Sequence, residues 1–244
     1  DRRLIEIFNK YGIKGTFHIN SGLFSQDIRI KPEEFPNLYK GHEIACHTLT
    51  HPTIARCPLS EVIKEIGDDR INLEGITHHP VQGLSYPNGS YSEDIEALLP
   101  GLGIKYSRIV GDSYGFALPD NLYEWLPTCH HNHRLLEMGE QFISLTKKQY
   151  LYMMYVWGHS YEFGRDNNWD VMERFCEMTG NRDDIWYATN IEYVNYMEAA
   201  KRLIYAYDSS FVYNPNAVSV WISINNNTVV EIPGGSQIEL TQYA

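Results

Sequence analysis

The feature that most constrains the fold is an alternation of two periodicities along residues 1–205. Short apolar runs with the character of buried strands are separated by longer segments in which apolar positions recur at helical spacing. Strands and helices that alternate in this way are typical of βα units, in which helices connect the strands of a largely parallel sheet. The sequence therefore predicts an α/β fold for this region.

The positions of the elements follow from these periods and from Pro, Gly and Ser at their ends. Strands are expected at 14–20, 42–47, 81–86, 104–109, near 122–128, 151–157 and 185–188. Helices are expected at 1–11, 58–75, near 92–100, near 133–143, 168–179 and 189–204.

The pattern changes near residue 206. Residues 211–240 contain short alternating runs separated by Asn-Pro, Asn-Asn-Asn and Pro-Gly-Gly turns, without a helical period. Such runs are typical of antiparallel hairpins. We therefore expect two domains, at 1–205 and 206–244, the second being a small antiparallel β appendage. Its expected role is packing against the main domain, with sugar binding as the less favoured alternative.

Composition excludes several classes of partner. The 244 residues include 20 Lys and Arg and 31 Asp and Glu, for a net charge of −11. This charge argues against a nucleic acid or an anionic membrane as the main partner. No apolar run approaches the ~20 residues of a membrane-spanning helix. Because the chain begins at Asp1 rather than Met, we expect it to be processed or trimmed, and its compartment is left open between secreted, cell-envelope and cytoplasmic.

Two histidines directly follow the expected strand at 42–47. His47 and His51 are four residues apart in the segment Gly41-His-Glu-Ile-Ala-Cys-His-Thr-Leu-Thr-His-Pro52. Imidazoles at this spacing can converge on one borderline metal ion such as Zn²⁺. The carboxyl end of a strand is also where parallel sheets and barrels place their sites. We therefore expect a metal-binding pair, with a purely structural pair as the alternative.

Two further motifs follow expected strands. His159, in the segment Tyr155-Val-Trp-Gly-His-Ser-Tyr-Glu-Phe163, is a candidate third ligand or general acid, or else a buried histidine bonded to a backbone carbonyl. The segment Ser85-Tyr-Pro-Asn-Gly-Ser90 is by itself common turn chemistry. Three motifs at one edge of a sheet together favour a functional site.

The other histidines are expected to be structural or exposed. His18 is expected in the core, His42 beside the strand that it precedes, and His78 and His79 at the surface. The run from Cys129 to His133 crowds possible ligands together and could in principle bind a second metal, but its spacing matches no standard zinc motif, so a second metal is the less favoured interpretation.

The order of these motifs resembles polysaccharide deacetylases of the NodB-homology type, carbohydrate esterase family 4. HTLTHP after GHEIAC resembles the family's zinc-binding motif, and KGTFHINSG its second strand. SYPNGSY, NLYEWLP and VWGHSYEF occupy the places of three later motifs. The resemblance covers roughly residues 1–205, and HTLTHP is its most specific part.

The resemblance implies a distorted (β/α)7 barrel and a metal-dependent hydrolase that removes acetyl groups from N- or O-acetylated carbohydrate. Carried over by position, His47 and His51 hold the metal, most simply Zn²⁺ with Co²⁺ or Ni²⁺ as alternatives, and His159 is the general acid. Trp125 and Trp157 line the pocket for the acetyl methyl group. Tyr86, in the motif with Pro87, donates its backbone N–H to the oxyanion.

Three departures from the family pattern bear on the chemistry. The Thr-Phe-Asp-Asp-Gly motif, which supplies the base and the third ligand, is absent, and we expect it upstream of Asp1. The arginine of the third motif is replaced by Ser85 or Tyr86. Asn121 and Glu124 stand where two aspartates are usual. Glu162 is expected to be a solvated charge, with replacement of the carboxylate beside His159 as its alternative.

Three functions are therefore open. The leading one is a deacetylase acting on an acetylated oligo- or polysaccharide. The second is a catalytically impaired carbohydrate-binding relative on the same scaffold, and the third is an amidohydrolase acting on a small non-sugar amide. An Asp-Asp pair just before Asp1 would separate the first from the second. The identity of the sugar and the type of acetyl linkage are not encoded in any of these motifs.

Overall fold

A computed structural model describes residues 1–147 and 149–243 of the chain, which form two compact units. The first unit comprises Asp1–Thr146 and Leu151–Ile191, and the second comprises Lys147–Tyr150 and Glu192–Ala244. Each unit is described by itself below. The domain boundary expected at residue 206 stays a prediction.

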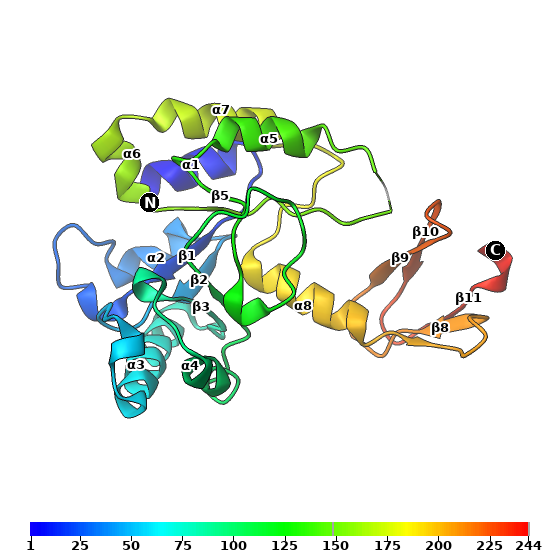
Figure 1. Ribbon diagram of the computed structural model, residues 1–244, viewed down its shortest axis with the longest axis horizontal. Coiled ribbons are helices and arrows are strands. Elements are labelled where there is room, and N and C mark those ends of the chain that lie inside the picture. Colours follow the sequence, from blue (N-terminus) through cyan, green and yellow to red (C-terminus); the bar gives the residue numbers. More distant parts are fainter. Residues whose placement is uncertain (148, 244) are drawn as a thin grey trace. The chain divides into compact units, whose positions relative to one another are not determined.

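The first unit is built around a parallel sheet in which the strands lie side by side in chain order (Figure 1). Its strands are β1 (Thr16–Ile19), β2 (Glu43–Cys46), β3 (Gly83–Ser85) and β4 (Tyr106–Arg108). A parallel bridge joins Arg108 to Trp125, and β5 (Cys129–His130) pairs in parallel with β6 (Val156–Trp157). This order is what consecutive βα units produce, and it confirms the α/β fold expected from the sequence.

Helices connect these strands along the chain. They are α1 (Arg2–Lys10), α2 (Phe35–Leu38), α3 (Leu59–Thr77), α4 (Glu93–Leu98), α5 (Leu135–Ile143), α6 (Ser160–Asp166) and α7 (Trp169–Thr179). Short 3-10 helices occur at Ser21–Leu23, Pro32–Glu34, Ile54–Arg56, Pro87–Gly89 and Leu122–Glu124.

Helix α3 shows why these segments are helical. Val62, Ile66 and Leu73 are separated by four and seven residues, which places them on one face of the helix, and all three are fully buried, so this face closes the core over β2. Asp69 lies on the same face and is also fully buried. A buried carboxylate needs hydrogen-bond donors, and the donors of Asp69 prove to be part of the candidate site.

Two expectations for the first unit are wrong. The expected strand at 151–157 is reduced to β6, and residues 185–188 form no strand although the structure describes them. Neither segment contains a buried residue, and Leu151 and Trp186 are 69% and 57% exposed, so an apolar run did not indicate a buried strand here. The sequence also did not indicate α6, a short helix whose buried residues are Glu162 and Phe163.

The second unit contains most of α8 (Asn190–Lys201) and the expected antiparallel strands. Strands β7 (Ile204–Tyr205), β8 (Phe211–Tyr213) and β11 (Gln237–Glu239) form one sheet in the order β11-β8-β7, and a 3-10 helix follows at Thr241–Tyr243. Strands β9 (Val220–Ile224) and β10 (Thr228–Ile232) form a hairpin. Asn225 and Asn226 turn it with φ values of 51° and 55°, which asparagine tolerates well.

Each unit has its own apolar core. In the second unit the core is small and consists of Val212, Val230, Ile232 and Leu240. Among the described helices, none has both the length and the apolar character that crossing a membrane requires.

Candidate active site

The candidate site lies at the carboxyl ends of the parallel strands, where His47 follows β2. Its Nδ1 atom is 2.8 Å from the carbonyl oxygen of Ser85 and 2.7 Å from the Oγ of the same residue. Because a carbonyl oxygen can only accept, Nδ1 carries the ring proton and donates it to Ser85. The Nε2 atom of His47 therefore presents a lone pair, which is the state in which imidazole binds a metal ion.

His51 is brought against His47 by a strained loop. The two rings are 4.7 Å apart at their centroids and inclined by 72°. Thr48 and His51 have φ values of 64° and 67°, in the left-handed region that costs a residue other than glycine about 1–3 kcal/mol. The Oγ1 of Thr48 accepts the backbone N–H of His51 at 3.2 Å, which helps to hold the turn. Such strain is typical of functional loops.

Polar groups beneath the loop fix its position. Asn20, after β1, donates its amide to the carbonyl oxygens of His47 and Thr48. The buried Asp69 of α3 accepts the backbone N–H of His47 at 3.1 Å. One turn earlier on α3, Glu65 accepts both the N–H and the hydroxyl of Thr50. The face of α3 that packs against the sheet therefore also anchors the histidine loop.

Electrostatics keep the two histidines neutral. Burial lowers the pKa of His47 well below its usual value, and nearby positive groups, including Arg108, act in the same direction. Burial also lowers the pKa of His51, with a smaller contribution from His159. Neutral imidazoles are the form that binds a metal, so this donor set fits a divalent ion.

The segment after β3 is packed into the protein. The Tyr86 ring is fully buried and stacks on Tyr91 with centroids 5.1 Å apart, and Pro87 is also buried. The backbone N–H of Tyr86 is donated to the Arg108 carbonyl oxygen at 3.1 Å. It is therefore engaged in this structure and not free for the oxyanion role that the resemblance implied.

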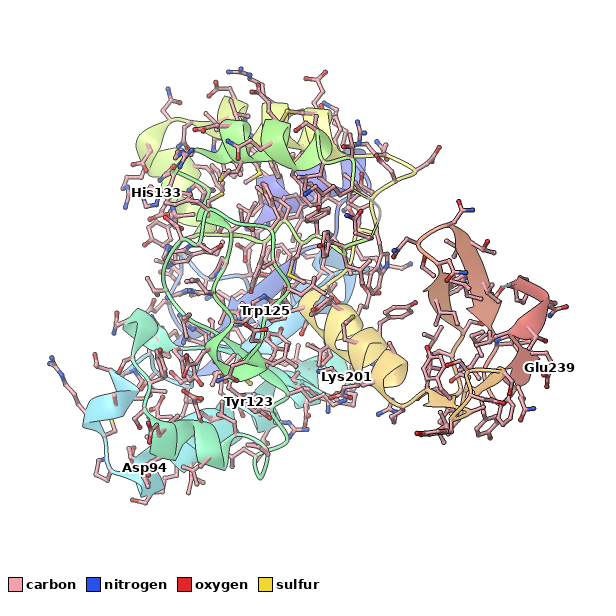
Figure 2. The ribbon with its side chains drawn as sticks, turned by 45° about the vertical axis from the view of Figure 1, so that its right-hand side comes forward. Asp94, Tyr123, Trp125, His133, Lys201 and Glu239 are labelled. Carbon is pink, nitrogen blue, oxygen red and sulfur yellow. The ribbon has the colours of Figure 1, made fainter. Side chains whose placement is uncertain are left out.

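The two candidate tryptophans differ in exposure. Trp125 is 2% exposed and packs in the interior of the first unit against Tyr106 and Tyr155 (Figure 2). Trp157 is half-buried, and the guanidinium carbon of Arg108 lies 4.7 Å from its ring centroid. The ring of Trp157 also contacts that of His159, with centroids 6.3 Å apart. Of these two tryptophans, Trp157 is therefore the one that offers an accessible surface beside His159.

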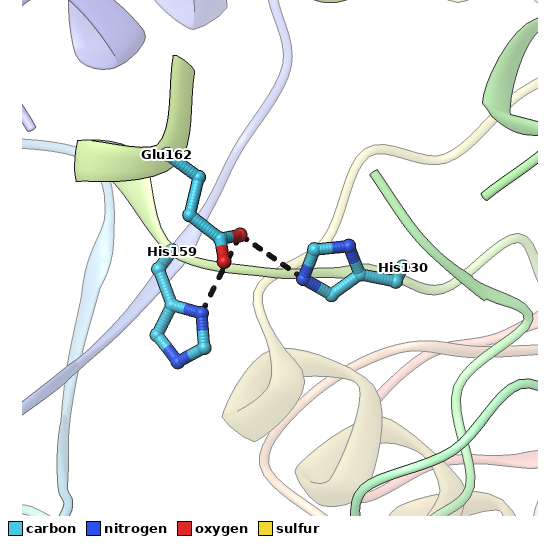
Figure 3. A group of neighbouring side chains, drawn as sticks. All are labelled: His130, His159 and Glu162. Atoms are coloured by element: carbon cyan, nitrogen blue, oxygen red, sulfur yellow. Dashed lines mark ion pairs between the residues drawn. The ribbon is translucent and has the colours of Figure 1, made fainter. Parts of the chain in front are cut away.

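His159 precedes α6, and its side chain is 44% exposed. Its Nδ1 atom is 3.5 Å from Oε2 of Glu162. The same oxygen lies 3.1 Å from Nε2 of His130 and 3.4 Å from Nε2 of His131 (Figure 3 shows His130, His159 and Glu162). We call these four residues the histidine–glutamate cluster. Glu162 is only 8% exposed, so the expectation that it is a solvated charge is wrong.

The sequence indicated His159 and Glu162 of this cluster, but not that His130 and His131 lie beside them. Atoms of His130, His159 and Glu162 lie within 4.8 Å of one another and could hold a metal ion. Burial lowers the pKa of His130, and it lowers that of His131 to about 4. The crowded run from Cys129 to His133 indicated possible metal ligands, but the spacing within the run did not show that His130 and His131 would face Glu162.

Asp112 accepts three hydrogen bonds from groups in the same region. It accepts the backbone N–H of His130 at 2.6 Å, the indole N–H of Trp157 at 3.0 Å and Nδ1 of His133 at 2.6 Å. Burial acts to raise the pKa of Asp112, but these hydrogen bonds outweigh it and hold the pKa below its usual value. His133 itself is 54% exposed at the surface of the unit (Figure 2).

The remaining histidines lie largely as expected. His18 is enclosed, close to the Cys46 carbonyl oxygen, and burial lowers its pKa to about 3. His42 accepts the backbone N–H of Gly15 and is structural. His78 and His79 are exposed.

Residues 1–107 match the family described as polysaccharide deacetylase. Among solved structures, a Mycobacterium smegmatis protein provisionally named a polysaccharide deacetylase superposes with a TM-score of 0.60 and 18% identity, covering 82% of this chain and 77% of that one. A carbohydrate esterase family 4 pseudoenzyme from Bacillus anthracis superposes with a TM-score of 0.52 and 12% identity, covering 79% of this chain and 59% of that one. A Streptococcus pyogenes deacetylase in complex with acetate superposes with a TM-score of 0.47 and 18% identity, covering 50% of this chain and 55% of that one.

The chain thus spans about half of that streptococcal protein, and 35% of two Bacillus polysaccharide deacetylase structures that it also matches. The likeness to the mycobacterial structure confirms the NodB-like α/β fold. The match of residues 1–107 to the polysaccharide deacetylase family confirms the resemblance seen in the sequence.

Proposed function

We propose that this protein is a metal-dependent hydrolase that removes acetyl groups from N- or O-acetylated oligo- or polysaccharide. The observation that carries this proposal is the His47–His51 pair, held neutral on a strained loop with the Nε2 of His47 available. Its position at the carboxyl end of β2, beside His159, is where a parallel α/β fold builds a site.

His47 and His51 would hold the metal, with Zn²⁺ as the first choice and Co²⁺ or Ni²⁺ as alternatives. A bound divalent ion supplies Lewis acidity to an acetyl carbonyl and lowers the pKa of water. Ser85 keeps the correct ring nitrogen of His47 free, and the loop anchored by Asn20 and Asp69 fixes the direction of both rings. Such outer contacts commonly decide how tightly a metal is held.

His159 would give a proton to the departing amine or alcohol. Its ring is exposed enough to reach a substrate, while Nδ1 faces the carboxylate of Glu162. A carboxylate on one side of an imidazole orients the ring and stabilises its protonated form. Glu162 would thereby fill the place left by Asn121 and Glu124, which replace the usual aspartates.

Trp157 would contact the acetyl group through its half-buried ring. Trp125, Tyr86 and Pro87 are buried, and we assign them to the wall behind the site. Because the N–H of Tyr86 is bonded to Arg108, its use for an oxyanion would require that bond to open.

The test is acetate release from a panel of acetylated sugars, with added Zn²⁺ and with a chelator. We expect metal-dependent release that is abolished by His47→Ala and His51→Ala. His78→Ala is the matched control, because this histidine is exposed and belongs to no motif. Release that persists at full rate in chelator, or in both loop variants, would exclude the proposed metal chemistry.

A carbohydrate-binding relative with impaired catalysis is the second candidate, and one observation favours it. Among residues 1–147 and 149–243, a convergent group of three possible ligands occurs at His130, His159 and Glu162 and not around His47. A folded chain that binds the acetylated sugars but releases no acetate under any metal condition would select this second function.

A further inference from the structure

The histidine–glutamate cluster contains two buried acceptor atoms that face each other. Oε2 of Glu162 and Nε2 of His131 are 3.4 Å apart, and neither has a hydrogen-bond partner. His131 is 3% exposed and Glu162 8%. Buried polar atoms are nearly always paired, so two that are unpaired and adjacent point to a missing cation between them.

The chain on the other side of the ring limits where His131 can lie. The ring is so close to the backbone that a Cβ on Gly158 would be 1.8 Å from Nδ1. The opposite edge of the ring, with Nε2, faces the carboxylate of Glu162 at 3.4 Å.

Two more imidazoles complete the arrangement around the same oxygen. His130 Nε2 is 3.1 Å and His159 Nδ1 is 3.5 Å from Oε2 of Glu162, without the geometry of a hydrogen bond to it. A tetrahedral zinc ion with ligands at about 2.0–2.2 Å holds its ligand atoms about 3.3–3.6 Å apart. The distances from Oε2 of Glu162 to the three imidazole nitrogens are thus already close to those between ligand atoms in a coordination shell.

We propose that the histidine–glutamate cluster is a second metal site, distinct from the His47–His51 pair, which takes a borderline divalent ion such as Zn²⁺ or Co²⁺. Glu162, His130 and His159 supply the ligand atoms, with Nε2 of His131 beside them. Two histidines and a glutamate form a ligand set that zinc commonly uses. The exposed edge of His159 gives the ion access from solvent.

Metal binding at the cluster requires the ring proton of His130 to move from one nitrogen to the other. Asn132 donates its backbone N–H to Nδ1 of His130 at 3.1 Å, so the metal-free ring carries its proton on Nε2. Coordination through Nε2 moves that proton to Nδ1 and exchanges the Asn132 bond for a metal bond. The side chain of His159 is 44% exposed, so its ring has room to turn and close the remaining distance to the ion.

The test measures Co²⁺ binding by its visible absorption in a His47→Ala, His51→Ala background, in which the first pair is removed. We expect this double variant to retain one equivalent of Co²⁺. Adding the isosteric Glu162→Gln, or the truncation His159→Ala at an exposed side chain, should weaken binding by more than about 100-fold, since loss of outer partners alone costs 10- to 100-fold. Adding His133→Ala, from the same run, should leave binding intact.

No Co²⁺ uptake by the double variant, or full uptake after both Glu162→Gln and His159→Ala, would overturn the second site. A second measurement, of acetate release against Zn²⁺ concentration, rests on the proposed function. Release should rise as the His47–His51 pair fills. It should then fall as a cation binds Nδ1 of His159 and prevents this ring from transferring a proton. If the chain releases no acetate at all, the proposed function fails while the Co²⁺ measurement still decides the second site.

Discussion

The hydroxyl of Tyr106 on β4 donates a hydrogen bond of 2.6 Å to Oε1 of Glu43 on β2, inside the parallel sheet. Tyr106 is fully buried and Glu43 is 8% exposed. The other carboxylate oxygen of Glu43 accepts from the Thr16 hydroxyl and the N–H of Ile191. One carboxylate thereby links three segments that are distant in sequence.

Tyr106→Phe should destabilise the protein by about 1–3 kcal/mol, because the change leaves a buried carboxylate oxygen without its donor. The measurement is urea unfolding, with Tyr161→Phe as the control, since Tyr161 is 64% exposed. A Tyr106→Phe variant as stable as the control would show that the bond contributes nothing.

Glu43 should also make stability depend on pH. Burial raises the pKa of its carboxyl above the ordinary value of 4.5, although four hydrogen bonds oppose the shift. The folded state therefore holds this proton more tightly than the unfolded state, and the contribution declines as the pH rises from about 4.5 upward. Glu43→Gln should flatten that part of the stability profile. A profile identical to that of the wild type would rule this source out.

Metal binding at His47 and His51 should survive mild acid. Burial lowers the pKa of both rings below the ordinary 6.5, so they stay neutral at pH values where a solvated histidine is charged. Zn²⁺ occupancy should hold through pH 6.5 and be lost only at lower pH. Titration of bound Zn²⁺ against pH in a Glu162→Gln variant isolates this pair, and loss centred at or above 6.5 would contradict the prediction.

Ser85→Ala should weaken metal binding by roughly tenfold, at the low end for an outer contact, because the Ser85 carbonyl remains to orient His47. Zn²⁺ affinity is the measurement and the exposed Ser144→Ala the control. Unchanged affinity would mean that the carbonyl alone fixes the ring.

Substitution of His159 should separate chemistry from metal binding at the first pair. His159→Ala should lower acetate release by roughly 10²–10⁴-fold, as expected for loss of a general acid, while Zn²⁺ at His47 and His51 is retained. Loss of that Zn²⁺ together with activity would instead make His159 one of its ligands.

Local sequence patterns were sufficient to predict much of the fold of this protein. Alternating strand and helix periods predicted the α/β fold because burial on one face of α3 or along β2 imposes a spacing on neighbouring residues. The placement of His47 and His51 after β2 was likewise a local matter, since both lie within five residues of the strand. The hairpin of β9 and β10 followed from its asparagine-rich turn.

The tertiary structure decided what those residues face. Glu162 meets His130 and His131 because β5 and β6 pair in parallel with His130 opposite Trp157, a register that no spacing in the sequence encodes. The N–H of Tyr86 is taken by the neighbouring strand for the same reason. Sequence periodicity records how each segment is buried, but contacts between segments depend on strand order and register, which form only when the sheet does.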